Sequence, residues 1–434
     1  MVYHFYMNIK NLRYKLLPKG LVPLADETYR KSRLGSAHVR YGMPAKNLRI
    51  IAVTGTNGKT STCSYLNDVL KQAGYSTAMF TTAVIEMAGG REINKTHRTV
   101  PLTSELFGFL KQAKKHKVDW VILEVTSHAL HQHKLWGIPI EIAVMTNLTQ
   151  DHLDYHGTMA RYAEAKAKLF SKYMNPKWCV LNVDDEWFDF YKQRSVGQIW
   201  TYGKKKHTDL HISSITSSSL GVKMRLDTAN MSILATSPVV GEFNGYNLAA
   251  VVSASLLVGI RPDVIRKSLE TIQPVPGRME MIQSAKGFSV VVDYAHTSDA
   301  LEKALKALRT TTSKTVSVVF GATGDRDPLK RPIMGEIAAK FADKIYLTDD
   351  ETYSEDGNAI RRSVFEGIIK GGGREKTIEI ADRKEAIEQA VKDAVKGDMI
   401  LVAGLGHQDY RAMNEGHIPW QESEVVREIL AKSK

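Results

Sequence analysis

The sequence predicts an α/β protein with two mostly parallel sheets, each covered by helices. Three observations lead to this prediction. Short apolar strands alternate with amphipathic helical segments over residues 49–276, and the same alternation restarts at residue 277. The stretch Pro274-Val275-Pro276-Gly277 between them has the composition of a hinge or linker. Polar clusters follow several of the strands. Strands that alternate with helices indicate parallel sheets with helices on their faces.

The elements can be placed in order along the chain. Residues 1–48 mix aromatic and basic residues with three prolines, so we expect a short segment rather than a complete domain. For residues 49–276 we expect strands at 50–54, 118–125, 142–147 and 178–182, an antiparallel excursion around 212–234 and a helix over 239–260. For residues 277–434 we expect a Rossmann-like unit with strands at 288–294, 317–321, 344–348 and 399–403. Ligands are expected at the carboxyl ends of these strands.

The composition argues against a membrane-spanning, secreted or disulfide-rich protein. The 434 residues are 43% hydrophobic and 24% charged, as in water-soluble globular proteins. No apolar run approaches the ~18 residues that a membrane span needs, and the first residues lack the apolar core of a signal peptide. Two cysteines argue against a disulfide framework or a cysteine metal site, and they favour a cytoplasmic location.

Positive charge is concentrated at the start of the chain. The net charge is +12, and residues 1–50 hold ten Lys or Arg against two acidic residues. This excess is typical of a solvated basic lead-in. Contact with an anionic substrate, a membrane surface or nucleic acid would explain it equally well.

A phosphate-binding loop is predicted at the front of the first unit. The sequence RIIAVTGTNGKTS at residues 49–61 joins a β-branched strand to a helix that runs to about Gln72. The glycines let backbone N–H groups turn inward, and the helix N-terminus and Lys59 favour phosphate. The hydroxyl of Thr60 stands where such loops bind magnesium. One consensus glycine is replaced by valine, and an ordinary turn between strand and helix is the alternative.

Further candidates follow the next strands. Glu124 ends a buried strand beside the loop and could bind magnesium, or it could cap the next helix. His128, His131 and His133 do not form a recognised zinc pattern. Tyr162, Lys166 and Phe170 recur at i, i+4 and i+8 on one predicted helical face, and a lysine on such a face is normally a surface residue.

Polar clusters also end four strands of the second unit. Loops rich in glycine, arginine and aspartate at strand ends pack poorly and are good anion sites. The clusters are residues 293–297, 321–327, 349–351 and 404–409.

Together these residues resemble the Mur ligase family of ATP-dependent amide-bond-forming enzymes, above all the members that add the third residue of the peptidoglycan stem peptide. The resemblance covers nearly everything from Arg49 onward. It rests on GTNGKTS, EVTSHAL, TNLTQDHLDYHG, YAEAK, GEFNGYNLAA, PGRME, VDYAHTSDALEKAL, GATGDRDPLKRPIMG and LVAGLGHQDY. It implies that a carboxylate of a muramyl-dipeptide acceptor attacks the γ-phosphate of ATP. An amino acid then displaces phosphate from the acyl phosphate.

The resemblance also implies roles for individual residues. Catalytic roles fall to Lys59, Glu124, His152 and Lys166, and magnesium would be held by Thr60, Glu124, His152 and a carbamylated Lys166. The nucleotide would contact Gly55, Thr56, Asn57, Gly58, Lys59, Thr60, Ser61, Asn147, Asn244, Asn247, Arg278 and Asp293. The acceptor would contact Thr99, Thr126, Gln132 and Lys134, and the amino acid Arg326, Asp350, Glu351, Thr352, Tyr353, Gly404 and Gln408.

Three departures from the family pattern bear on the substrates. The family's UDP-binding N-terminal domain is longer than the 48 residues found here, so this segment is expected to contact an anionic carrier or a membrane surface. The Asp-Asn-Pro-Arg loop of diaminopimelate-adding members is replaced by residues 350–353, and a glutamate by Gln408. The acidic run 349–351 would suit a cationic side chain, which makes lysine as credible as diaminopimelate.

Rival functions remain open at this point. Folylpolyglutamate and cyanophycin synthetases share the ATPase core, a non-catalytic nucleotide-binding scaffold would keep the loop, and a nucleic-acid-binding ATPase would explain the charge. We expect a monomeric enzyme that uses ATP and magnesium and binds no nucleic acid.

Overall fold

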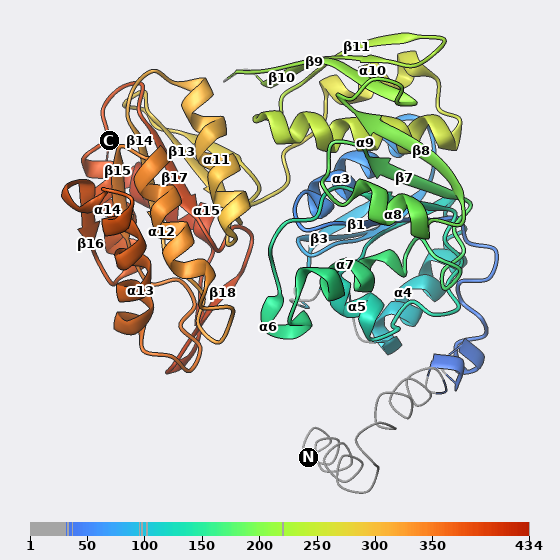
Figure 1. The fold of residues 1–434 in the computed structure, drawn as a ribbon, viewed down its shortest axis with the longest axis horizontal. Helices are drawn as coiled ribbons and strands as arrows, with labels where there is room; N and C mark the ends of the chain where they lie inside the picture. Colours follow the sequence, from blue (N-terminus) through green and yellow to red (C-terminus); the bar gives the residue numbers. More distant parts are fainter. Residues whose placement is uncertain are drawn as a thin grey trace, which may run out of the picture.

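The computed structural model describes residues 32, 34–36, 38–94, 96, 99–100, 103–218 and 221–433. The expected contact of residues 1–48 with a carrier or membrane therefore falls largely outside the described residues. The described chain forms two units side by side (Figure 1). Residues 50–270 contain the first sheet and residues 280–432 the second.

The first unit is built on an eleven-stranded sheet with the order β11-β10-β9-β8-β7-β6-β1-β5-β2-β3-β4. Strand β1 (Ile50–Thr54) is fully buried and lies parallel to both neighbours, β5 (Trp120–Glu124) and β6 (Ile142–Met145). The remaining strands are β2 (Thr77–Phe80), β3 (Val84–Met87), β4 (Gly90–Ile93), β7 (Trp178–Asn182), β8 (Gln198–Gly203), β9 (Leu210–Ser218), β10 (Gly221–Asp227) and β11 (Ser232–Ser237). The sheet is parallel from β2 to β9 and antiparallel at both margins.

Helices cover both faces of this sheet (Figure 1). One face packs against α3 (Lys59–Gln72), α9 (Glu242–Val258) and α10 (Pro262–Glu270). The other carries α4 (Thr103–Lys115), α5 (Ser127–His131), α6 (Leu153–His156), α7 (Met159–Ala167) and α8 (Phe188–Arg194). The helix α9 is apolar all round because it lies between the sheet and its neighbours α3 and α10.

The second unit has a six-stranded sheet with the order β12-β13-β17-β14-β15-β16. Its strands are β12 (Glu280–Gln283), β13 (Ser289–Asp293), β14 (Val316–Phe320), β15 (Lys344–Leu347), β16 (Thr377–Glu379) and β17 (Met399–Ala403). Its helices are α11 (Ser298–Thr311), α12 (Lys330–Phe341), α13 (Gly357–Lys370), the 3-10 turn η1 (Arg374–Lys376), α14 (Arg383–Lys392) and α15 (Glu422–Lys432). A hairpin of β18 (Tyr410–Met413) and β19 (Gly416–Pro419) completes it.

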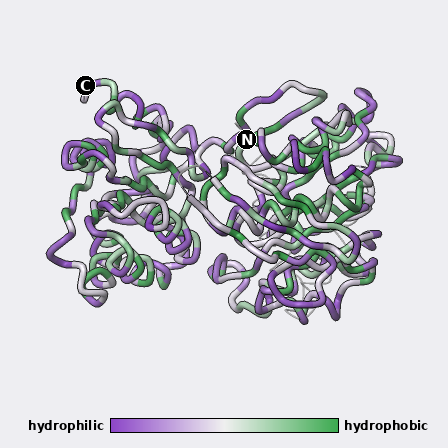
Figure 2. The backbone as a smooth tube through the Cα atoms, turned by 90° about the horizontal axis from the view of Figure 1, so that it is seen from above, coloured by the Kyte–Doolittle hydropathy of each residue, from purple (hydrophilic) through white to green (hydrophobic). Residues whose placement is uncertain are grey.

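The predicted α/β class is confirmed. Every predicted strand is present to within three residues at either end, and the antiparallel excursion is β9 to β11. The sequence does not predict the strands β2 to β4, β8, β12 and β16 or the β18–β19 hairpin. Among the described residues, none of the helices is long and apolar enough to cross a membrane. Figure 2 shows the two units as separate bodies that meet along a narrow waist.

Candidate active site

The phosphate-binding loop connects β1 to α3 and requires glycine at two positions. Gly55 and Gly58 have φ angles of 152° and 83°. A Cβ at Gly55 would lie 1.8 Å from Oγ1 of Thr146, and one at Gly58 would lie 2.2 Å from Oδ1 of Asn247. Thr146 directly follows β6 and Asn247 lies in α9, and both pack against the loop. The glycines therefore let the loop between β1 and α3 pack closely against these neighbours.

Asn147, just after β6, holds the loop in place. Its backbone carbonyl accepts a 2.8 Å hydrogen bond from the Thr56 N–H, and its side-chain oxygen accepts one of 3.0 Å from the Asn57 N–H. Its amide donates in return to the Asn57 carbonyl. Asn147, which was expected to contact the nucleotide, therefore binds the phosphate loop itself.

Glu124 ends β5 beside the loop. Its Oε2 accepts hydrogen bonds from the Thr60 hydroxyl at 3.0 Å and from the Thr82 N–H at 2.7 Å. The next helix, α5, is capped by Thr126. The alternative that Glu124 serves as a helix cap is therefore wrong. A buried carboxylate beside a hydroxyl is a suitable oxygen pair for magnesium.

Two lysines donate hydrogen bonds to backbone carbonyls of the loop. The Lys59 ammonium donates to the Thr56 carbonyl at 2.7 Å, and the Lys166 ammonium donates to the Gly55 carbonyl at 2.7 Å. Burial lowers the pKa of Lys59 and lowers that of Lys166 well below its ordinary value. Lys166 also lies 4.7 Å from the ring centre of Tyr162.

The expectation that Lys166 is a surface residue is wrong. Its exposed fraction is 1%, because α7 packs its lysine-bearing face against the phosphate loop instead of water. Phe170, which shares the predicted face, lies beyond the end of α7 but is buried in the same core.

His152 stands next to these groups with Asp151. Its Nε2 lies 3.3 Å from the Asp151 carboxylate, and its ring lies 4.7 Å from that of His128. Burial lowers the pKa of His152 to about 3, so the ring is neutral at physiological pH. A neutral imidazole can accept a proton or bind a metal.

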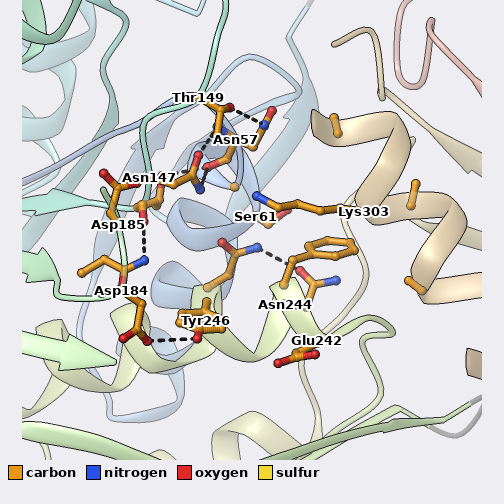
Figure 3. A pocket seen from close by; sticks show the side chains of 18 of the residues that line it. Asn57, Ser61, Asn147, Thr149, Asp184, Asp185, Glu242, Asn244, Tyr246 and Lys303 are labelled. Carbon is orange, nitrogen blue, oxygen red and sulfur yellow. Dashed lines mark hydrogen bonds between the residues drawn. The ribbon is translucent and has the colours of Figure 1, made fainter. Parts of the chain in front are cut away.

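A cavity of about 740 Å³ lies between the two units and begins at the loop (Figure 3). It is lined from the first unit by Asn57, Gly58, Ser61, Asn147, Asp184, Asn244, Tyr246 and Asn247, and from the second by Arg278, Asp293, Tyr294 and Lys303. Asn247 donates to Asn244 at 3.0 Å, and Tyr246 donates to Asp184 at 3.0 Å. This volume is in the range of sites for ligands of nucleotide size.

The second unit reaches the loop through two side chains. The Arg278 guanidinium lies 3.4 Å from the Thr60 hydroxyl, and the Asn57 amide donates to Asp299 at 2.6 Å. Asp293 accepts from the Met279 N–H at 2.7 Å, and burial raises its pKa to about 6.

Three of the four residues expected to hold the acceptor make hydrogen bonds within the first unit. Thr99 accepts a hydrogen bond from the Thr82 hydroxyl at 2.7 Å, while Thr126 caps α5 and Gln132 donates to Tyr155 at 3.3 Å. Lys134 follows α5 and is half-buried. The hydroxyl oxygen of Thr126 therefore already accepts a structural hydrogen bond, while its O–H can still donate to a ligand.

The residues expected to bind the amino acid gather at the strand ends of the second unit. Glu351 is buried and accepts from the Ala412 N–H at 3.1 Å and from Gln408 at 3.3 Å. The Arg326 guanidinium lies 5.2 Å from the Tyr353 ring centre. The Thr352 and Gly404 backbones complete the group: Gly324 packs on the Thr352 carbonyl, and Gly404 on Asp350.

The three acidic residues 349–351, expected to form a pocket for a cationic side chain, have different surroundings in the structure. Asp349 pairs with Arg361 and is already compensated. Asp350 is buried near Arg383 and Arg411, and burial raises its pKa. Only Glu351 combines burial with neutral hydrogen-bond partners.

Several residues at the site were not singled out from the sequence. Asp299 and Lys303 lie within the quoted segment VDYAHTSDALEKAL, but helical spacing gives them no distinction from surface residues. Thr82 follows the unforeseen strand β2. Asp151 lies within the motif TNLTQDHLDYHG, and its proximity to Lys330 and His296 depends on the contact between the units.

Most of the chain is similar to known proteins. Residues 53–255 match the family model for the Mur ligase middle domain, and residues 277–406 match that for the Mur ligase glutamate ligase domain. The UDP-N-acetylmuramoyl-L-alanyl-D-glutamate–2,6-diaminopimelate ligase of Geobacillus kaustophilus is 39% identical over 89% of this chain and 80% of its own.

Solved structures agree with this result. A UDP-N-acetylmuramoyl-L-alanyl-D-glutamate–2,6-diaminopimelate ligase superposes with a TM-score of 0.62 at 35% identity, covering 89% of this chain and 79% of the other. A Mycobacterium tuberculosis folylpolyglutamate synthase complexed with ADP has a TM-score of 0.71 at 17% identity, with 86% and 91% covered, which shows a shared fold.

Proposed function

The chain belongs to the Mur ligase family, and we propose that it joins the carboxylate of a UDP-muramyl-dipeptide-type acceptor to the amine of a diamino acid. It is an ATP-dependent carboxylate–amine ligase of peptidoglycan precursor synthesis. The observation that carries the proposal is the convergence of the phosphate loop, Glu124 and Lys166 with Arg278 and Asp293 of the second unit.

The phosphate loop would orient the γ-phosphate toward the acceptor carboxylate. The amides at the start of α3 and the Lys59 ammonium supply positive charge where the phosphoryl group develops negative charge. Arg278 adds a cation from the second unit, so the charge is complete only when the units are in contact. Asn244 and Asn247 line the cavity from α9, and we propose that the adenine lies on this side of it.

The donors near the loop fit magnesium. Thr60 and Glu124 present two oxygens 3.0 Å apart at the carboxyl end of β5, and oxygen is the ligand type that magnesium prefers. When bound, the ion would neutralise phosphate charge. Among the described residues, no group of three or more His, Cys, Asp or Glu side chains is arranged to hold a metal, so a second ion needs another carboxylate.

Lys166 can supply that carboxylate by carbamylation. Addition of carbon dioxide requires a neutral amine, and burial favours the neutral form of Lys166. The product would carry negative charge beside His152. Intact-mass analysis of protein kept under carbon dioxide should show the added mass, and a Lys166→Arg variant should not.

The amino acid would lie between Arg326 and Glu351. Arg326 is suited to an α-carboxylate, and the buried Glu351 carboxylate is suited to a distal ammonium. Tyr353 stands where the arginine of diaminopimelate-adding members is expected. We therefore propose lysine or another diamino acid, with diaminopimelate, named for the relatives, as the comparison substrate.

The test is product formation from defined substrates. Purified protein with ATP, magnesium, UDP-N-acetylmuramoyl-L-alanyl-D-glutamate and one amino acid should release phosphate and yield the amide, identified by mass spectrometry. A folate or a nucleic acid should not replace the acceptor. Phosphate release without any amide product would contradict the proposal.

We also propose the cellular location and the oligomeric state of the enzyme. Because the reaction consumes ATP and both cysteines are buried and free, we place it in the cytoplasm, and we expect a monomer in size-exclusion chromatography. The basic segment 1–48 would contact the anionic carrier or a membrane surface. Its deletion should then raise the Michaelis constant for the acceptor or release the protein from anionic vesicles.

A further inference from the structure

The cavity between the units contains more negative than positive side chains. Its lining includes the carboxylates of Asp184, Asp185, Glu186, Glu242 and Asp293 and the cations Arg278, Lys303 and Lys306. Most of these carboxylates accept hydrogen bonds from the protein: Asp184 from Tyr246, Asp185 from the Leu148 N–H and Asp293 from the Met279 N–H. The binding of a polyphosphate in this cavity therefore depends on the few cationic side chains that can reach it.

Lys303 is the cation of α11 that reaches into the cavity. Figure 3 shows its side chain extended from the helix toward Ser61, which lies in the first turn of α3. Its ammonium donates to Asp299 at 2.9 Å, one turn earlier on the same helix. With 39% of its side chain exposed, it can move from this partner to a bound ligand without opening a core.

Asp299 fixes where this ammonium stands. The same Oδ2 atom accepts from Asn57 of the phosphate loop at 2.6 Å and from the Thr149 hydroxyl at 3.4 Å. One carboxylate oxygen therefore joins the loop, the segment after β6 and Lys303. Asp299 fixes the position of α11 relative to the loop. It also holds the Lys303 ammonium beside the first turn of α3.

Lys306 provides a contrast on the same helix. Its ammonium pairs with Glu302 at 2.6 Å and lies 5.1 Å from the ring centre of Phe341. It borders the cavity, but its charge is directed to its own unit. General positive potential and a specific phosphate contact can thus be separated by comparing the two lysines.

We propose that Lys303 is a nucleotide-binding residue that contacts a phosphate on the Ser61 side of the cavity, and that Asp299 is its positioning residue. This rests on the proposed use of the cavity for ATP. The second unit then contributes a phosphate contact in addition to Arg278. Bound nucleotide exchanges the Lys303–Asp299 pair for a Lys303–phosphate pair while Asp299 stays on Asn57.

Calorimetric titration with ADP and with adenosine tests this without the ligase reaction. Lys303→Met should weaken ADP binding about tenfold, the loss of one hydrogen bond between charged groups, and change adenosine binding less than about twofold. Lys303→Arg should retain most of the ADP affinity, and Lys306→Met should lose less affinity than Lys303→Met. Lys340→Met, on α12 outside the cavity lining, should match the unchanged protein.

Unchanged ADP affinity in Lys303→Met would overturn the proposal, as would equal losses in Lys303→Met and Lys306→Met. So would an equal loss for adenosine, because adenosine has no phosphate. Normal ADP binding with no amide product from any acceptor would refute the proposed ligase substrates and leave this inference standing.

Discussion

The side-chain amide of Asn57 donates a 2.6 Å hydrogen bond to the carboxylate of Asp299, 242 residues farther along the chain. Asn57 belongs to the phosphate loop of the first unit and Asp299 to the first turn of α11 in the second. The contact places the loop and the second unit in one site. Because the chemistry requires charge from both units, this bond is a direct target for mutation.

Replacing Asp299 by alanine should therefore impair nucleotide use. We expect kcat/KM for ATP to fall roughly tenfold, since a hydrogen bond to a charged group is lost, with little change in melting temperature. Steady-state phosphate release measures the first and thermal denaturation the second. Glu302→Gln, on the same helix but paired with Lys306, is the control. An equal effect in both variants would assign the loss to the helix as a whole.

Glu124→Gln should change the magnesium requirement. The amide keeps the size of the side chain but removes the negative oxygen that lies 3.0 Å from Thr60. The magnesium concentration for half-maximal activity should rise by at least about tenfold. A magnesium titration of phosphate release measures this, with Glu92→Gln on the exposed strand β4 as the control. An unaltered titration curve would exclude Glu124 as a ligand.

The enzyme should use ATP less efficiently at pH values below about 6. Burial raises the pKa of Asp293 to about 6, so the carboxyl becomes protonated as the pH drops through that value. If ionised Asp293 is required, kcat/KM for ATP should decline about tenfold per pH unit below 6. The same shift favours the folded, protonated form at low pH, and that contribution to stability is lost as the pH rises through 6.

Asp293→Asn supplies the check on this assignment. The variant should be less active but nearly independent of pH between 5 and 7. A profile in the unchanged protein that is flat over this range would show that Asp293 does not control ATP use.

Glu351→Gln should alter the choice of amino acid. The buried carboxylate is proposed to bind a distal ammonium, so the Michaelis constant for lysine should rise by about tenfold or more, while norleucine, which lacks the ammonium, should be little affected. Glu415→Gln in the exposed turn of the β18–β19 hairpin is the matched control. Parallel changes for lysine and norleucine would show that Glu351 only supports the loop.

The buried ion pair of Arg383 and Glu422 should matter for stability. Both side chains have no exposed surface, and Glu422 also accepts from the Trp420 indole. Glu422→Gln leaves the Arg383 charge buried without its partner, so urea unfolding should show a loss of about 3–5 kcal/mol. Glu424→Gln, which breaks an exposed pair with Arg427, should cost less than about 1 kcal/mol.

The sequence predicts the strands well because buried parallel strands are short, apolar and bounded by glycine or polar residues, as β1 and β17 are. It also predicts which loops carry chemistry, since strand ends share one edge of a sheet. The burial of Lys166 was missed because helical spacing cannot tell which face of α7 meets the loop. Asp299 and Lys303 were missed for a related reason: their role depends on how the two units meet.

The central claim is that the acceptor carboxylate attacks ATP to give an acyl phosphate. Labelling the acceptor carboxylate with a heavy oxygen isotope tests it most directly. Transfer of one labelled oxygen into the released phosphate for each amide formed is the predicted result. Unlabelled phosphate, with the label kept in the product or returned to water, would contradict the account.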